Sequence, residues 1–377
     1  MDQPYKIYVC SFHTILLEVI MQKKESIATI RARERKYFER GPEWFCEFRY
    51  SKIKGLDQEE NVNRRDPSAV LCVDGTYYTW YTKNTGPHAG FGTGDLDAKV
   101  WPWDYSEIWY ASSKDGYTWK EEGRAVGRGE KGCYDDRSVF TPEILQHDGH
   151  FYLVYQAVQH PYLRRTKNTI GMAIAESPHG PWKKVDQPIL KPTDTGEWLG
   201  EEDNHLSVKH KGEFDSHKVH DPVLFYYRDK YYLYYKGETM GEQLYMGGRE
   251  TKWGVAIADN PTGPYVRSPY NPITNSGHET ILWPYKEGMV AMLTTDGPEK
   301  NTIQYAEDGI NFNIMSMIKN APEAPGPFRS YSTTDPLCGI KWGLYHICHD
   351  GWNYIVRFDM DLWQREYYHE RRSFNDK

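Results

Sequence analysis

The chain has 377 residues, of which 39% are hydrophobic and 15% aromatic, and its formal net charge is −7. No run of about 18 apolar residues is present, which excludes a membrane-spanning helix. The 30 Tyr and 13 Trp exclude the aromatic-poor composition of disordered chains. An acidic chain offers no broad basic surface, so we expect neither a nucleic-acid nor a membrane partner. The length predicts one large domain or two ordinary ones, and Tyr, Trp, Thr and Val favour strands.

The first predicted element is a polar helix over residues 23–40, which is rich in Glu, Arg, Lys and Ala and stops at Gly41-Pro42. Its apolar positions are too sparse to build a core. It therefore predicts a surface helix or an arm that packs on another subunit. We divide the chain into an N-terminal helical extension, residues 1–50, which would form a dimer arm, and a β-rich domain, residues 51–377.

Short aromatic and β-branched runs recur from about residue 57 onward, each bounded by turn residues. Four runs follow a turn and predict the second strand of a hairpin, at 76–82, 150–158, 231–238 and 289–295. Each is followed by a strand with small residues, a turn and an aromatic, at 108–119, 171–182, 253–265 and 302–312. The pattern predicts a repeat of several short strands.

A third element precedes each pair of strands, at 65–70, 140–145, 220–224 and 278–282, and a similar one at 334–337 begins a fifth unit. The four steps from Asp66 to Asp335 span 269 residues, an average of about 67. Such a repeat predicts an all-β fold, a five-bladed β-propeller. A β-sandwich also has short strands, but it would not explain an acidic element before each hairpin. We interpret Asp335 itself as a turn residue.

Acidic residues at the starts of axial propeller strands converge on one face, which would bring Asp66, Asp221 and Glu279 into one funnel. Clustered carboxylates around an uncharged ligand are typical of glycoside hydrolysis. Histidine can also serve as the acid, and His220 and His278 stand beside two of these carboxylates. Neighbouring residues of a strand point to opposite faces, so a turn or a bulge would be needed to bring both members of a pair into one site.

Four motifs carry a resemblance to a known family: N-R-R-D-P-S (63–68), Y-D-D-R-S-V-F-T-P-E (134–143), H-D-P-V-L-F (220–225) and S-G-H-E-T (276–280). In this order they resemble glycoside hydrolase family 117, the α-1,3-(3,6-anhydro-L-galactosidases) or α-neoagarobiose hydrolases. The resemblance runs from about residue 24 to the C-terminus. It implies a five-bladed propeller with an N-terminal helical segment exchanged across a homodimer. It also implies an exo-acting, inverting glycosidase of agar degradation that releases 3,6-anhydro-L-galactose from the non-reducing end of neoagarobiose and neoagaro-oligosaccharides.

The resemblance also implies roles for individual residues. Asp66 matches the general base that activates water, and His278 matches the general acid. Asp221 matches the carboxylate that supports the transition state, and Glu279 matches a further acidic group of the site. Positions near the bound sugar are matched by Gln156, His220 and Thr141, and the loop that supplies sugar-stacking rings by Trp101 and Trp103.

Several alternatives remain open at this point. A related five-bladed glycosidase acting on another α-linked sugar, such as an arabinoside, would use a carboxylic acid as proton donor, and a carbohydrate-binding propeller would use none. We expect no required cofactor and no catalytic metal, although a structural divalent cation in the propeller channel is compatible with the sequence. His217-x-x-His220 could hold a metal, but a solvated polar loop explains it as well. No signal-peptide cleavage site is recognised near the N-terminus, so we expect a cytoplasmic enzyme, with the periplasm as the alternative.

Overall fold

The structure is a computed structural model that describes residues 23–34, 44–245, 248–249, 251–329 and 335–364. Strands dominate it, as the composition predicts. The first sheet has the order β2 (Val62–Arg65), β4 (Thr76–Thr85), β5 (Glu107–Ser113) and β6 (Trp119–Val126), with β3 (Leu71–Val73) also paired to β4. The second sheet contains β7 (Ser138–His147), β8 (His150–Val158), β9 (Thr169–Ala175) and β10 (Lys183–Lys184). The third contains β13 (Lys218–Tyr227), β14 (Lys230–Glu238), β17 (Lys252–Ala258) and β18 (Val266–Arg267).

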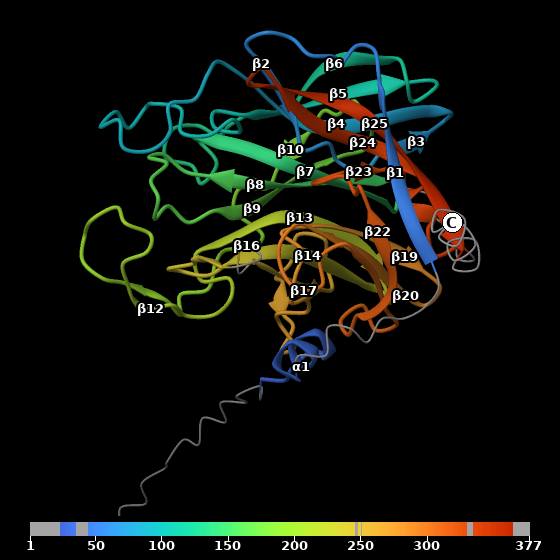
Figure 1. The fold of residues 1–377 in the computed structure, drawn as a ribbon. Helices are drawn as coiled ribbons and strands as arrows, with labels where there is room; N and C mark the ends of the chain where they lie inside the picture. The colour runs from blue at the N-terminus through green and yellow to red at the C-terminus, as the bar shows by residue number, and fades with distance from the viewer. Residues whose placement is uncertain (1–22, 35–43, 246–247, 250, 330–334, 365–377) are drawn as a thin grey trace, which may run out of the picture.

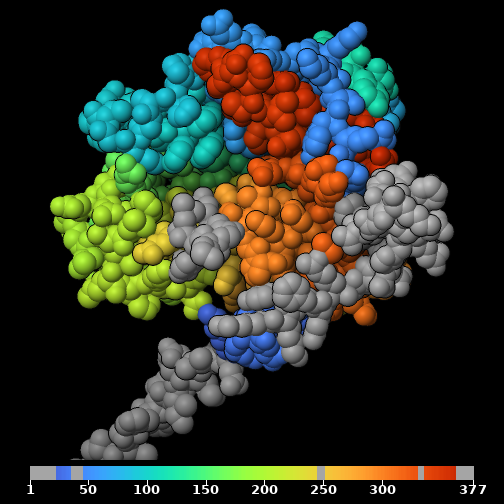
Figure 2. Space-filling view, in the orientation of Figure 1, coloured from blue at the N-terminus to red at the C-terminus, as the bar shows by residue number. Residues whose placement is uncertain are grey.

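The last sheet has eight strands and joins the first described strand to the last. Its order is β19 (Glu279–Tyr285), β20 (Gly288–Thr294), β21 (Thr302–Ala306), β22 (Asn313–Lys319), β1 (Trp44–Lys52), β25 (Trp352–Gln364), β24 (Trp342–His349) and β23 (Gly326–Pro327). Strand β1 runs parallel to β22 and antiparallel to β25, and Figure 2 shows its blue residues against the orange and red ones. Residues 44–50, which we assigned to the helical extension, are therefore part of this sheet. The fourth and fifth predicted units share one continuous sheet, so the count of five blades stays a prediction.

The small elements lie in the connections between strands. They are the hairpins β11 (Glu197–Trp198) with β12 (Val208–His210) and β15 (Leu244–Tyr245) with β16 (Gly248–Arg249), and the 3₁₀ turn η1 (Cys338–Ile340). The described residues of the predicted element at 334–337 do not begin a strand. Asp335 accepts the backbone N–H of Leu337 in the turn before η1, which confirms the interpretation of Asp335 as a turn residue. Residue 334 lies outside the described residues.

The core is divided into apolar clusters that lie between successive sheets. One cluster joins the first sheet to the second through Trp80 and Tyr155, and others join the second to the third and the third to the last. The last sheet returns to the first through Leu344 and Tyr81. In Figure 1 the sheets follow one another in chain order until red β25 lies beside the first sheet. This is a propeller-like, nearly all-β arrangement, and its core rings account for much of the aromatic content.

The N-terminal helix is shorter than predicted among the described residues. Helix α1 spans Ile27–Glu34, and residues 35–43 lie outside the described part. It packs on its own chain, where Ser26 Oγ donates to the Pro272 carbonyl and Arg31 forms a buried ion pair with Glu299 at 2.7 Å. The homodimer arm therefore stays a prediction. Among the described helices, none has the length and apolarity needed to cross a membrane.

Candidate active site

One pocket of about 600 Å³ gathers all nine residues that the sequence analysis singled out. These are Asp66, Trp101, Trp103, Thr141, Gln156, His220, Asp221, His278 and Glu279. The volume lies within the usual range for small-molecule sites. The four predicted acid–base groups therefore share one cavity with the predicted sugar-binding groups.

Local distortions of the backbone explain how residues from different sheets reach this pocket. Asp66, Thr141 and Asp221 each stand directly before a proline, and their φ angles are +48°, +48° and +47°. Between His220 and Val223 strand β13 advances three residues while β14 advances two, which marks a bulge. Left-handed backbone is uncommon in residues other than glycine and costs about 1–3 kcal/mol. The bulge suspends strand alternation, so His220 and Asp221 both line the pocket.

Asp66 is held by its backbone as well as by its side chain, which is only 9% exposed. Its backbone N–H donates to Nδ1 of His346 at 3.2 Å. Burial, reinforced by the charge of Arg65, lowers the pKa of His346 well below its usual range, so this imidazole is neutral and its Nδ1 can accept that bond. The charged group beside the Asp66 carboxylate is Arg65, whose Nη2 lies 3.6 Å from Oδ1. The Asp66 carboxyl group thus lies beside one cation, and Asp66 lines the pocket.

Lys236 places a buried cation between two of the acids, and the sequence analysis missed it. Its side chain is 3% exposed, its Nζ is ion-paired with Asp221 Oδ2, and it lies 3.7 Å from Glu279 Oε1. Burial raises the pKa of Glu279 to about 8; Lys236 opposes this shift, and the charges of Asp221 and Asp66 add to it. Burial therefore favours the protonated form of Glu279. A single Lys in the aromatic run at 231–238 was the available signal.

His278 is contacted at both ring nitrogens. Nε2 lies 3.4 Å from Glu279 Oε1, and Nδ1 lies 3.0 Å from Oδ2 of Asp296, a residue that the sequence analysis also missed. The backbones of the two segments are joined as well, since the N–H groups of His278 and Gly277 donate to the carbonyls of Thr295 and Asp296. The imidazole is therefore fixed with one edge toward the acids of the pocket. The only sequence signal for Asp296 was an Asp-Gly turn after the strand at 289–295.

An aromatic wall forms another side of the pocket. The rings of Trp101 and Trp103 are stacked, with centroids 5.1 Å apart and planes at 8°, and Phe91 packs edge-on against Trp101 at 5.5 Å. The guanidinium of Arg65 lies 5.2 Å from the Trp103 ring, so Trp103 contacts both Arg65 and Trp101. Trp101 is 37% exposed, and Trp103 is less exposed. Of the two tryptophans, Trp101 therefore offers more ring surface to a sugar.

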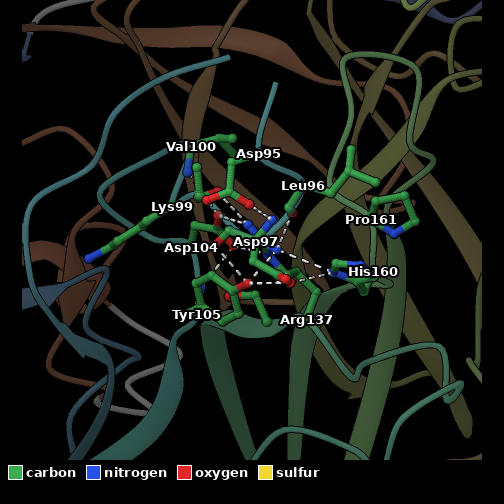
Figure 3. Close-up of polar contacts among 12 residues, drawn as sticks. Asp95, Leu96, Asp97, Lys99, Val100, Asp104, Tyr105, Arg137, His160 and Pro161 are labelled. Carbon is green, nitrogen blue, oxygen red and sulfur yellow. Dashed lines mark hydrogen bonds and ion pairs between the residues drawn. The ribbon is translucent and has the colours of Figure 1, made fainter. Parts of the chain in front are cut away.

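A buried arginine fixes the loop that carries these rings (Figure 3). Arg137 is 1% exposed and donates to both carboxylate oxygens of Asp104 at 2.8 Å, to the carbonyls of Leu96 and Ala98, and to the hydroxyl of Tyr105. These bonds use all five N–H donors of a guanidinium. Asp104 also accepts two backbone N–H groups of the same loop. The conformation of residues 95–105, and with it the tryptophan pair, is thereby specified.

The remaining predicted groups line the pocket with little exposure. Gln156 and His220 are 3% and 8% exposed, and Thr141 sits at its bulge beside them. Within the described ranges, no group of three or more His, Cys, Asp or Glu side chains is arranged to hold a metal ion. In the His217-x-x-His220 pair, His217 Nδ1 lies 3.2 Å from Glu238 Oε1.

Comparison with solved structures identifies the family. Zg3597, described as a family 117 glycoside hydrolase produced by the marine bacterium Zobellia galactanivorans, is 37% identical in sequence to this chain and superposes with a TM-score of 0.70. The match covers 84% of this chain and 91% of that one. The chain belongs to glycoside hydrolase family 117. This family 117 protein is accordingly an enzyme that hydrolyses glycosidic bonds.

More distant comparisons agree on the fold of this family 117 enzyme. The profile of glycosyl hydrolases family 43 matches residues 61–200. A structure described as a glycoside hydrolase has a TM-score of 0.56 at 12% identity, covering 88% of this chain and 94% of that one. A structure described as a BT0996 RGII complex has a TM-score of 0.54 at 14% identity, covering 89% and 96%. A comparison with curated proteins finds no match.

Proposed function

We propose that this family 117 enzyme is an exo-acting, inverting α-1,3-(3,6-anhydro-L-galactosidase) that removes 3,6-anhydro-L-galactose from the non-reducing end of neoagarobiose and neoagaro-oligosaccharides. The observation that carries the proposal is the pocket that brings Asp66, Asp221, His278 and Glu279 together beside two tryptophans. These are the positions that match the family motifs, and paired acid and base groups are what glycoside hydrolysis requires.

In the proposed reaction Asp66 acts as the base. Its carboxylate takes a proton from a water molecule while the water oxygen attacks the anomeric carbon of the anhydro-sugar. The bond from that carbon to O3 of galactose breaks, and His278 gives the Nε2 proton to O3. The products are free 3,6-anhydro-L-galactose, with inverted anomeric configuration, and the shortened saccharide.

Asp221 has a supporting role in this proposal. Its carboxylate faces the pocket and would stabilise positive charge that develops at the anomeric carbon. The ion pair with Lys236 supports this role, because a nearby cation favours the charged form of a carboxyl group.

A second candidate has an observation of its own. A carboxylic acid that holds its proton at neutral pH is the usual donor in glycosidases, and Glu279 fits that description. This favours Glu279 as the acid of a propeller glycosidase acting on another α-linked sugar, such as an arabinoside. The two candidates differ in the residue that donates the proton and in the sugar released. A carbohydrate-binding propeller without activity is the third candidate.

The accompanying proposals concern partners and surroundings. We propose a homodimer in which the N-terminal helical extension forms an arm, a reaction that requires no cofactor, and a cytoplasmic location with the periplasm as the alternative. In the structure Arg31 of the helix pairs with Glu299 of the same chain. In the proposed homodimer, the arm would make this contact with the other subunit. Size-exclusion chromatography with light scattering tests the homodimer.

Incubation with neoagarobiose followed by NMR of the products tests the main proposal. We expect free 3,6-anhydro-L-galactose whose first-formed anomer has the inverted configuration. Retention of configuration would refute the mechanism, and release only from arabinosides would refute the substrate. Calorimetric binding of neoagarobiose without any hydrolysis would favour the binding propeller.

Two variants test the assigned roles. Asp66→Asn and His278→Ala should each abolish release of the anhydro-sugar while the protein still folds, as thermal melting would show. Asp259→Asn is a matched control, because Asp259 is 78% exposed and pairs with Lys230 on the surface. Near-normal turnover by His278→Ala would assign the proton donor to Glu279 instead.

A further inference from the structure

Two acidic side chains contact opposite edges of one imidazole. Asp296 Oδ2 lies 3.0 Å from Nδ1 of His278, and Glu279 Oε1 lies 3.4 Å from Nε2. The three side chains are between 16% and 22% exposed, so solvent screens their interactions only partly. Of these three side chains, His278 and Glu279 line the pocket and Asp296 does not. Asp296 contacts the edge of the imidazole that carries Nδ1.

We infer that Asp296 is a positioning residue that decides which of two adjacent groups, His278 or Glu279, holds the proton to be transferred. The inference rests on the proposed function, because it concerns the donor of that reaction. The inference also goes beyond the proposed function. The roles that the family motifs imply include none for Asp296, and they do not say which of the two adjacent groups, His278 or Glu279, keeps the proton.

The need for such a residue follows from counting protons. An imidazolium beside a Glu279 carboxylate and a neutral imidazole beside a Glu279 carboxylic acid contain the same atoms and the same total charge. Burial, together with the charges of Asp66 and Asp221, raises the pKa of Glu279 and favours the second arrangement, whereas Lys236 opposes it. A carboxylate at Nδ1 stabilises the imidazolium directly, so Asp296 favours the first arrangement.

The backbone holds Asp296 in this place. The N–H groups of Gly277 and His278 donate to the carbonyls of Asp296 and Thr295, both at 3.1 Å. Thr295 and Asp296 have φ angles of +52° and +53°, which is an uncommon conformation for these residue types. Gly297 follows with φ +88°, and a Cβ there would lie 2.5 Å from Ser276 Oγ. Strained backbone that is over-determined by its surroundings is typical of functional sites.

Charged groups from several elements face this pair and belong to any account of its titration. They are Asp296 after β20, Glu279 at the start of β19, Lys236 on β14, Asp221 on β13, Asp66 after β2, and Glu323 in the loop after β22. Asp296 is the one that contacts Nδ1 of His278, so a change there alters the imidazole first.

Asp296→Asn tests the inference, because Asn keeps an oxygen that accepts the Nδ1 proton and loses only the negative charge. An anion next to an imidazolium raises its pKa, so removing the anion lowers that pKa. The alkaline limb of the kcat/KM profile, where the donor loses its proton, should move to lower pH by about one unit or more. At a fixed alkaline pH this is about a tenfold loss. Asp259→Asn should leave the profile unchanged.

Titration of His278 by NMR in the unliganded protein measures the same quantity without turnover, with His278→Ala used to assign the signal. A pKa lowered by about one unit in Asp296→Asn supports the inference whether or not neoagarobiose is cleaved, so failure of the proposed substrate is recognised separately. An unchanged His278 pKa overturns it, even if the enzyme is active. An unshifted alkaline limb in an active variant also overturns it.

Nitrogen chemical shifts of the wild-type protein give a test that needs no variant. Above its pKa, a neutral His278 that donates to Asp296 must carry its proton on Nδ1. The other tautomer, with the proton on Nε2, would overturn the inference. This keeps it open to refutation if Asp296→Asn does not fold.

Discussion

Replacement of Arg137 by Met should show how much of the pocket depends on one buried ion pair. Arg137 and Asp104 are 1% and 0% exposed at their side chains, and their two bonds of 2.8 Å are parallel. Met has a similar apolar stem but no donor. The variant leaves the Asp104 carboxylate buried with only the N–H groups of Val100 and Tyr105 as partners.

The expected cost follows from that burial. Removing one partner of a buried ion pair costs about 3–5 kcal/mol, since it leaves an uncompensated charge. Two backbone donors remain on Asp104, so we expect a value near the lower end, about 3 kcal/mol. Arg124→Met is the matched control, because Arg124 pairs with Glu107 with side chains 58% and 25% exposed. Such a pair contributes at most about 1 kcal/mol.

Urea unfolding of Arg137→Met, Asp104→Asn and the double variant measures the coupling between the two residues. We expect a coupling free energy of about 2 kcal/mol or more, and a raised KM for neoagarobiose in Arg137→Met, because Trp101 and Trp103 lie on the loop that Arg137 holds. Effects of the single variants that add to within about 0.5 kcal/mol would refute the reasoning. So would an Arg137→Met protein no less stable than Arg124→Met.

Three further predictions concern the pocket itself. The pKa of Glu279 in the folded protein is about 8, above its ordinary value of 4.5. The free energy of unfolding of the wild type relative to Glu279→Gln should therefore be highest below pH 4.5 and fall as the pH rises to 8. Urea unfolding at about pH 4–9 should show this decline, and a difference that does not change with pH would contradict it. Trp101→Ala should raise KM by about tenfold without changing Tm, because its ring is partly exposed, whereas Trp103→Ala should lower Tm. Lys236→Met should cost about 3 kcal/mol in urea unfolding, because it leaves the Asp221 carboxylate without its cation. The surface variant Lys230→Met should cost much less, and equal stabilities of the two variants would contradict the prediction.

Much of the strand content could be predicted because it depends on neighbouring residues. Strand β8 covers the predicted run 150–158, and β14 begins one residue before the predicted run 231–238. Strand β1 could not be predicted in the same way. Its partners lie more than 260 residues away, for example Trp44 opposite Gln364, and no local pattern reports such a pairing. The polar helix before it led us to extend the helical segment too far.

The residues of the site also differ in whether the local sequence could predict them. Asp66, Asp221 and His278 were predictable because they stand in short motifs at repeated positions. Asp296 and Lys236 were missed, because each matters through one contact with a residue from another strand. A lone Lys within an aromatic strand and an Asp-Gly turn are ordinary features by themselves. Only the fold shows that they meet the acids.

The repeated acidic-Pro element explains why strain and function coincide in this molecule. A residue before proline that adopts left-handed backbone costs stability, and the chain accepts this at Asp66, Thr141 and Asp221, all of which face the pocket. At Asp335 the same dipeptide caps a turn, and its φ is not among the positive ones of the described residues. In the units that contain a proline, the residue before it is therefore distorted where its side chain enters the pocket and relaxed where it does not. The fourth unit has no such proline, and His278 and Glu279 line the pocket there without positive φ. Within the proline-containing units, the backbone contrast, more than the acidity of the residues, separates site positions from turn positions.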